Sequence, residues 1–440
     1  MSASASPPSE VAVLEAALDP TWLAEHCGRP VRASRLRLKP GVSLALSLVD
    51  ACRGTPVGWA RFLWPRARSR ARSLVAWAGA RGLAVHQRDW AGLVLQWGGL
   101  ASDPALGRVV ASSLGPWAAA LPGLEGPGGT GPGGAVAEAP YGPPASGGLP
   151  ASGGLPASGD SPGRRGAPGA EGTFQVMRHN PLRRLVIRAG SYVVRLSARP
   201  TPWGLAPLSE LAALVPTPPP VELPTSPAPG LPAQVRGEGG VHVAAQALTG
   251  DTDLGRCPDP EATYRAGTLL ARLHRARPVP GGALEAALGP APDAGRALRA
   301  HAGVLDHLDR ALAGRARALA GRLPRSPVGP GVLSHGDASP DQVLLERASG
   351  LVWLTDFDRL CLAEPATDLG SYLSQVNPEL GQALLDGYRA GGGLPPGPAE
   401  REAALTRSLV LRAAEPLRAA DPAWRQALSA TLEDLEERCP

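Results

Sequence analysis

A segment of about fifty residues near the middle of the chain contains almost no large apolar side chains. Residues 122–173 are rich in glycine, proline and serine, and they include the short repeat ASGGLP-ASGGLP-ASGDSP. Such a sequence buries too little apolar surface to offset the conformational entropy lost on folding, which predicts a disordered linker. The linker splits a chain of 440 residues, already longer than one core usually supports, into separately packed parts.

Apolar and polar residues alternate on both sides of the linker, a pattern typical of antiparallel strands with one buried face. Before the linker the alternation covers residues 34–50 and 55–64, and after it residues 174–188 and 189–198. Later segments place apolar residues at helical intervals, which predicts helices over most of the chain after residue 251. We therefore expect a sheet-rich part followed by a helix-rich part.

The charge distribution argues against nucleic acid as a partner. The formal net charge is +5, and because Lys39 is the only lysine, arginine supplies almost all of the positive charge. Basic residues are scattered among acidic ones and are not massed into a stripe with interleaved aromatic side chains.

Other features of the sequence favour a cytoplasmic protein without membrane contact. The five cysteines are widely spaced and form no CxxC pair, so neither a disulfide framework nor a zinc site is indicated. The N-terminus lacks the pattern of a signal peptide, and no apolar run is long enough to span a bilayer.

Oxygen-bearing side chains stand at the ends of two short strands between residues 332 and 358. Asp337 follows the first strand, Gln342 comes five positions later, and Asp356 follows the second strand. A tight turn at Ser349-Gly350 predicts a hairpin that brings Gln342 and Asp356 together. Metal-assisted phosphoryl transfer needs this set, with one carboxylate to accept the proton of the attacking hydroxyl and two oxygen ligands to hold Mg²⁺.

Three sequence motifs resemble the aminoglycoside phosphotransferase and choline kinase-like family, which has a protein-kinase-like fold. They are LSHGDASPDQVLL, LTDFDRLCLAEPATDLGSYL and GTLLARLHRARP, and the resemblance extends from Phe174 to the C-terminus. It implies an α+β, bilobal fold with an antiparallel sheet N-lobe and a helical C-lobe.

The resemblance also implies roles for individual residues of the catalytic loop and the following strand. Asp337 corresponds to the catalytic base, while Gln342 and Asp356 correspond to the Mg²⁺ ligands. Asp368 corresponds to a residue that braces the catalytic loop. His335 stands two residues before Asp337, where we expect it to support the loop by hydrogen bonding in preference to transferring a proton.

In the N-lobe, the same resemblance predicts the contacts to ATP. Arg195 corresponds to the basic residue that binds the nucleotide phosphates, and Glu210 to its ion-pair partner on the next helix. The hinge strand, residues 241–248, would offer backbone groups to adenine at Ala245 and Ala247.

Some residues keep two interpretations. Asp358 is either a second metal contact or a cap of the next turn. Arg183 and Arg184 either cover the phosphates or lie at a solvated hairpin end. Gln342 stands where the family has asparagine, and Arg195 where lysine is commonest, so a nucleotide-binding or partner-binding pseudokinase is an alternative to an active enzyme.

The resulting domain organisation has five parts. Residues 1–30 form an N-terminal segment, 31–121 a β-rich cap-like domain, 122–173 the linker, 174–250 the N-lobe with hinge, and 251–440 the C-lobe. The cap-like domain resembles, more loosely, the N-terminal cap of maltokinase-like members of the same superfamily.

The sequence thus predicts an ATP- and Mg²⁺-dependent phosphotransferase that acts on a hydroxyl group of a small molecule. Sugar, aminoglycoside, choline-like and amino-alcohol acceptors all remain open, because specificity in such a fold comes from loops and helices without a readable code. A hydrolase ranks last, since no nucleophile or second metal cluster accompanies the acidic pair. The sequence carries no information on the oligomeric state.

Overall fold

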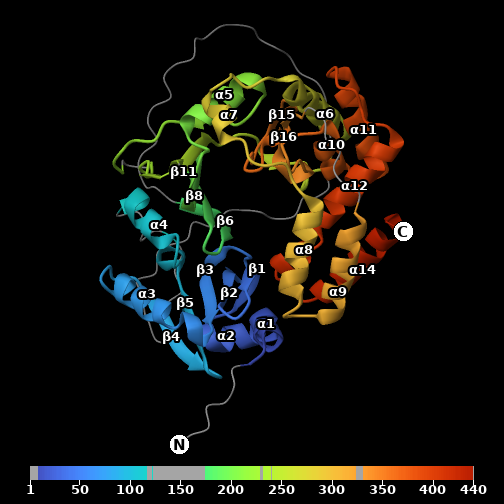
Figure 1. Ribbon diagram of the computed structural model, residues 1–440. Coiled ribbons are helices and arrows are strands. Elements are labelled where there is room, and N and C mark those ends of the chain that lie inside the picture. Colours follow the sequence, from blue (N-terminus) through green and yellow to red (C-terminus); the bar gives the residue numbers. More distant parts are fainter. Residues whose placement is uncertain are drawn as a thin grey trace, which may run out of the picture.

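The chain forms three units, which we call the N-terminal domain, the N-lobe and the C-lobe (Figure 1). The computed structural model describes residues 8–115, 121, 174–227, 231–238, 240–323 and 331–439. The predicted linker, residues 122–173, lies outside the described residues. None of the helices in the described part of the chain is long and apolar enough to cross a membrane.

The N-terminal domain is an antiparallel five-stranded sheet with strand order β1-β2-β3-β5-β4 and helices packed around it. Strands β2 and β3 are buried on both faces, whereas the alternation in their sequences predicted only one buried face, and the polar residues Ser43, Ser47 and Arg61 are buried with the apolar ones. Its elements are α1 (Glu10–Leu18), α2 (Pro20–Cys27), β1 (Val31–Lys39), β2 (Ser43–Asp50), β3 (Pro56–Leu63), η1 (Pro65–Ala67), α3 (Ser69–Gly79), β4 (Val85–Trp90), β5 (Leu93–Gly98), η2 (Leu100–Ser102) and α4 (Gly107–Leu114).

The N-lobe is a second antiparallel sheet, with strand order β10-β11-β8-β7-β6 and β9 paired to β11. Helix α4 of the N-terminal domain shares a hydrophobic core with β6, β7, β8 and β11. The N-terminal domain therefore contributes apolar side chains to the core of the N-lobe. The N-lobe elements are β6 (Phe174–Asn180), β7 (Arg184–Ala189), β8 (Tyr192–Thr201), α5 (Leu205–Leu214), β9 (Pro220–Val221), β10 (Arg236–Gly237) and β11 (Gly240–Ala247).

The C-lobe is helical and carries two small sheets that hold the candidate site. Helices α6 and α11 pack so closely that a Cβ atom at Gly387 would lie 1.8 Å from the carbonyl oxygen of Tyr264. The C-lobe elements are β12 (Thr252–Asp253), α6 (Pro260–Arg275), α7 (Ala283–Ala287), α8 (Ala294–Leu305), α9 (Arg310–Arg322), β13 (Val332–Ser334), η4 (Pro340–Gln342), β14 (Val343–Glu346), β15 (Leu351–Leu354), β16 (Cys361–Ala363), α10 (Pro365–Leu373), α11 (Pro378–Ala390), α12 (Pro398–Arg412), α13 (Glu415–Arg418) and α14 (Trp424–Arg438).

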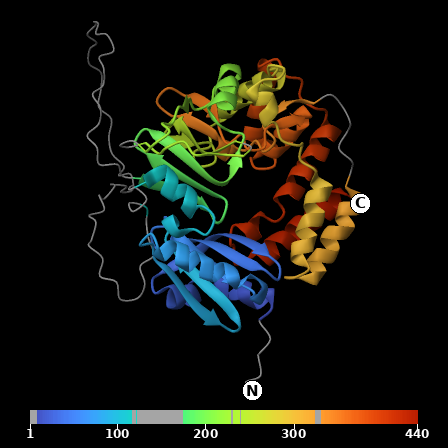
Figure 2. The ribbon, with the colours of Figure 1, turned by 60° about the vertical axis from the view of Figure 1, so that its left-hand side comes forward.

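The N-terminal domain contacts both lobes. Apolar side chains of α1, α2 and the first sheet share one core with helices α8, α9, α12 and α14 of the C-lobe. Figure 2 shows the domain below the N-lobe, with the C-lobe helices reaching down to it on the other side. The two lobes are therefore joined twice, once directly and once through this domain.

A buried polar network fastens the N-terminal domain to the N-lobe. His179 of β6 contacts Ser47 Oγ at 3.0 Å through Nδ1 and Asp103 Oδ2 at 3.1 Å through Nε2. Burial would raise the pKa of Asp103, but His179 and backbone N–H donors more than offset this and hold that pKa below its usual value. The Ser47 side chain has no exposed surface, so this Ser-His-Asp set is a structural contact.

The predicted fold class is confirmed: a sheet N-lobe precedes a helical C-lobe, and a β-rich N-terminal region is present. The strands predicted on both sides of the linker are observed as β1 to β3 and β6 to β8. One boundary differs from the expectation. Helices α1 and α2 bury Val13, Leu14 and Leu23 in the core of the N-terminal domain, so the segment before residue 31 belongs to that domain.

We expect His179→Leu to destabilise the protein strongly, because it keeps the side-chain volume but leaves the buried Asp103 carboxylate without its histidine partner. Breaking a buried charged pair typically costs about 3–5 kcal/mol. Chemical denaturation measures this loss. The control is His307→Leu, which removes an exposed histidine 3.6 Å from Glu10. An equal effect of the two substitutions would contradict a special role for the buried network.

Candidate active site

The loop after β13 is organised by one buried carboxylate. Asp368, in the first turn of α10, accepts hydrogen bonds from the backbone N–H groups of His335 at 2.7 Å and Gly336 at 2.8 Å. The same carboxylate lies 2.9 Å from Nε2 of His274, a residue of α6. Burial would raise the pKa of Asp368, but His274 and these donors outweigh burial and keep it below its usual value.

Gly336 gives the loop a backbone conformation that other residues rarely adopt. Its φ is 79°, and a Cβ atom at this position would lie 2.1 Å from the carbonyl oxygen of Arg359. The sharp turn at Gly336 directs the next residue, Asp337, toward a cavity. The cavity has a volume of about 380 Å³ and lies between this loop and helices α8, α10 and α12.

Asp337 lies between two arginines and the cavity. Arg359 Nη1 is 3.3 Å from its Oδ2, and Arg412 Nη2 is 3.8 Å from its Oδ1. Burial raises the pKa of Asp337 above its usual value, although both arginines act in the opposite direction. The polar and charged residues that line the cavity are Asp337, Glu364, Thr367, Ser371, Arg407, Ser408 and Arg412.

The predicted hairpin brings Gln342 and Asp356 together. The N–H of Thr355 donates to the backbone oxygen of Gln342 at 3.0 Å, directly beside the paired strands β14 and β15. Asp356 adopts a left-handed backbone conformation with φ 59°, which is uncommon for a residue other than glycine and concentrates at functional sites. His335 connects this hairpin to the loop after β13, because its Nε2 lies 2.9 Å from the carbonyl oxygen of Thr355.

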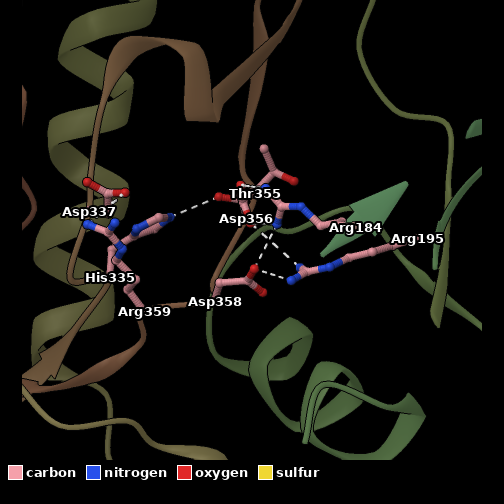
Figure 3. A network of polar contacts seen from close by, with 8 residues as sticks. All are labelled: Arg184, Arg195, His335, Asp337, Thr355, Asp356, Asp358 and Arg359. Carbon is pink, nitrogen blue, oxygen red and sulfur yellow. Dashed lines mark hydrogen bonds and ion pairs between the residues drawn. The ribbon is translucent and has the colours of Figure 1, made fainter. Parts of the chain in front are cut away.

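Two arginines of the N-lobe reach the carboxylates that follow β15, as Figure 3 shows. Arg184 Nη1 is 3.2 Å from Asp356 Oδ1 and 2.7 Å from Asp358 Oδ2. Arg195 forms an ion pair with Asp358, and its Nη1 is 3.6 Å from Asp356 Oδ1. Burial would raise the pKa of Asp356, but Arg184 and Arg195 outweigh it and keep the carboxylate ionised.

Gln342 has an unsatisfied side-chain oxygen. Its Oε1 is buried and has no hydrogen-bond partner among the described residues. A buried polar atom without a partner is unfavourable unless a ligand satisfies it. The oxygen therefore fits the predicted role of a metal ligand beside Asp356. Within the described ranges, no group of three or more His, Cys, Asp or Glu residues is placed to hold a metal.

Glu210 does not pair with Arg195 as expected. Its carboxylate accepts hydrogen bonds from the N–H groups of Ala283 at 2.8 Å and Leu284 at 3.0 Å, at the start of α7. The free N–H groups of a helix N-terminus attract a carboxylate, which explains this placement. Arg195 takes Asp358 as its partner, so the prediction for this pair was wrong.

The hinge strand is present as β11, but part of its backbone is already engaged. The N–H of Ala247 donates to Pro219 O at 2.8 Å, and its carbonyl accepts from Thr249 Oγ1 at 3.1 Å. The prediction that Ala247 offers its backbone to adenine conflicts with these bonds. Ala245 pairs with Val194 of β8 and Val221 of β9, so it lies inside the sheet.

Several residues of the site were not singled out from the sequence. Arg359 and Arg412 flank Asp337, and His274 contacts Asp368 from α6. No local signal marks the two arginines, because their partner Asp337 lies 22 residues from Arg359 and 75 residues from Arg412 along the chain. Asp358 pairs with Arg184 and Arg195. Its two possible roles, metal contact or cap of the next turn, stay predictions.

Comparison with known proteins assigns the chain to a family. Residues 176–404 match the family model described as the phosphotransferase enzyme family, APH. The match covers more than half of the chain, so this protein belongs to that family. A search of curated proteins gives no match.

Solved structures to which this chain is similar include a kinase family protein and two phosphotransferases. A choline/ethanolamine kinase family protein from Mesorhizobium loti is 18% identical, with a TM-score of 0.43, covering 62% of this chain and 89% of its own. Macrolide 2′-phosphotransferase MphH from Brachybacterium faecium is 20% identical, with a TM-score of 0.39 and coverages of 60% and 94%. The GDP and kanamycin complex of APH(2″)-IIIa is 18% identical, with a TM-score of 0.40 and coverages of 60% and 92%.

We expect Asp368→Asn to lower the free energy of unfolding by about 3 kcal/mol, since one carboxylate oxygen becomes an amino group facing backbone donors. Chemical denaturation checks this value. The matched control is Asp386→Asn, which removes a half-exposed carboxylate paired with Arg389 and should change stability by less than about 0.5 kcal/mol. Equal effects would show that the Asp368 contacts do not organise the loop.

Proposed function

We propose that this protein is an ATP-dependent kinase that phosphorylates a hydroxyl group of a small molecule. Family membership supports phosphotransfer as the reaction class. The observation that carries the proposal is the position of Asp337. It stands on a loop held by Asp368, its carboxylate faces a cavity, and His335 links the loop to the hairpin that bears Asp356.

In this proposal Asp337 orients the acceptor hydroxyl and accepts its proton during phosphoryl transfer. Burial raises the pKa of this carboxylate, so it binds a proton more readily than an exposed aspartate does. Arg359 and Arg412 hold the side chain in place from two directions. The cavity of about 380 Å³ is large enough for a small acceptor.

Asp356 and Gln342 would hold Mg²⁺, because their oxygen atoms suit a hard cation and Oε1 of Gln342 lacks a partner among the described residues. When bound, the cation supplies positive charge that stabilises the phosphate oxygens during transfer. Arg184 and Arg195 would bind the nucleotide phosphates, since guanidinium groups form bidentate contacts with phosphate. To do so, both arginines must leave Asp356 and Asp358.

A second candidate function is nucleotide binding without turnover. The observation that favours it is that Asp356 and Asp358 are already neutralised by Arg184 and Arg195. Gln342 in place of asparagine points the same way, because the longer side chain shifts its oxygen relative to the family geometry. Nucleotide turnover separates the two candidates.

We expect Asp337→Asn to remove most of the acceptor phosphorylation while ATP binding is preserved. General-base assistance is typically worth about a hundredfold to ten-thousandfold, so the loss should be plain in a phosphate-transfer assay with a panel of hydroxyl compounds. ATP affinity, measured by calorimetry, is the internal control. Unchanged phosphorylation in Asp337→Asn would rule out the proposed base.

We expect MgATP to raise the melting temperature, because a ligand that binds only the folded state stabilises it by about 2.7 kcal/mol at a hundred times its Kd. Asp356→Ala should abolish the part of the shift that depends on Mg²⁺, whereas Asp386→Ala should not. The shift is measured with ATP in Mg²⁺ and in EDTA. An equal shift of the wild-type protein in both conditions would favour the second candidate function.

A further inference from the structure

Five arginines meet where the three units of the protein come together, and we call them the arginine cluster. Strand β1 of the N-terminal domain contacts both β6 of the N-lobe and α13 of the C-lobe. The cluster is formed by two residues of β1, one of β6, one of the β6–β7 turn and one of α13. These are Arg35, Arg37, Arg178, Arg183 and Arg418.

The positive charge of the arginine cluster is poorly compensated. Arg35 forms an ion pair with Glu415. For Arg37, Arg178, Arg183 and Arg418, no carboxylate of the described residues lies within ion-pair distance. Arg178, Arg183 and Arg418 are partly buried among their neighbours, but each keeps surface exposed to solvent that a ligand can reach.

The arginines of the cluster are close enough to repel one another. Burial lowers the pKa of Arg183 first, and the charges of Arg37, Arg184 and Arg418 lower it further. Burial and the charges of Arg35 and Arg184 lower the pKa of Arg178, and Asp356 and Asp341 offset this only in part. Burial also lowers the pKa of Arg418, where Glu415 acts in the opposite direction and Arg359 and Arg35 act in the same one. An anion bound among these groups would relieve the repulsion.

The cluster adjoins the candidate active site on two sides. Arg359, which forms the ion pair with Asp337, is an electrostatic neighbour of Arg418. Arg184, which binds Asp356 and Asp358, is an electrostatic neighbour of both Arg178 and Arg183. The cluster is therefore linked to the candidate active site through Arg359 on one side and Arg184 on the other.

We propose that the arginine cluster binds an anionic group, phosphate or carboxylate, carried by the phosphoryl acceptor. Guanidinium groups bind both anions through paired N–H donors. The nucleotide phosphates already have candidate partners in Arg184 and Arg195, so the cluster is available to a second anion. This inference rests on the proposed kinase function, and it limits the acceptors to hydroxyl compounds that carry a negative charge.

The first test measures anion binding without turnover. Inorganic phosphate is titrated at constant ionic strength, and binding is followed by the rise in melting temperature in the presence of saturating ADP. The double variant Arg183→Gln/Arg418→Gln should need at least about ten times more phosphate for the same rise, because it loses two charge-assisted contacts. The control Arg72→Gln/Arg108→Gln removes two exposed arginines from α3 and α4 and should behave as the wild type.

Three results would overturn the inference. The first is an equal response of the cluster variant and the wild type to phosphate. The second is loss of the phosphate effect when ADP is added, which would make the cluster part of the nucleotide site. The third is tight, salt-dependent binding of a single-stranded oligonucleotide that the double variant loses, which would assign the cluster to nucleic acid.

A second test separates this inference from the proposed function. Matched acceptors such as glucose and glucose 6-phosphate, or a sugar alcohol and its acid, are compared in the phosphate-transfer assay. Turnover of neutral acceptors alone would refute the anionic acceptor and leave the kinase intact. Cluster-dependent phosphate binding with no turnover of any acceptor would refute the kinase and leave the anion site intact.

Discussion

The buried carboxylate of Asp368 is the contact on which the candidate active site depends. It satisfies two consecutive backbone N–H groups of the loop and approaches the ring of His274, so three separate elements converge on one side chain. A buried charge is tolerated only when such partners surround it. The loop geometry that presents Asp337 therefore follows from the placement of α10 against α6 and β13, and not from the loop sequence alone.

The charges of the site are balanced within the protein. Asp337, Asp356 and Asp358 each have arginine partners. Those of Asp356 and Asp358 come from the N-lobe, and those of Asp337 come from the C-lobe. Such pairs lower the cost of gathering carboxylates in one place, and the pairs made by Arg184 and Arg195 also join the N-lobe to the C-lobe. A nucleotide with its cation brings the same two kinds of charge. When a nucleotide and its cation bind, the arginines exchange carboxylates for phosphates and the carboxylates exchange arginines for the cation. The electrostatic free energy of binding is then smaller than the number of new contacts suggests.

Local patterns in the sequence predicted the strands on both sides of the linker and the hairpin between β14 and β15. The spacing of Asp337, Gln342 and Asp356 relative to two short strands was enough to place Gln342 beside Asp356 in a hairpin, because hairpin pairing is a local property. The partners of Arg195 and Glu210 could not be predicted in this way. Long flexible side chains choose among carboxylates that are distant in sequence, and the choice depends on how the lobes pack.

The arginine cluster illustrates the same limit. Its members are far apart in the sequence, so no single segment predicts a concentration of positive charge. Strand alternation places Arg35 and Arg37 on one face of β1, but only the contact of β1 with β6 and α13 brings Arg178 and Arg418 beside them. A charge patch that forms between domains cannot be predicted from the sequence of any single domain.

The double attachment of the N-terminal domain has a mechanical consequence. A two-lobed enzyme can open by rotation about a single hinge, but here α4 packs in the N-lobe core while α1 and α2 share a core with α8, α9 and α14. Each of the three units contacts the other two. If the lobes rotated relative to each other, the N-terminal domain would have to shift at its interface with the N-lobe or at its interface with the C-lobe. Both of these interfaces bury apolar side chains, and the one with the N-lobe also contains the buried contacts of His179, so the N-terminal domain restricts how far the lobes can separate.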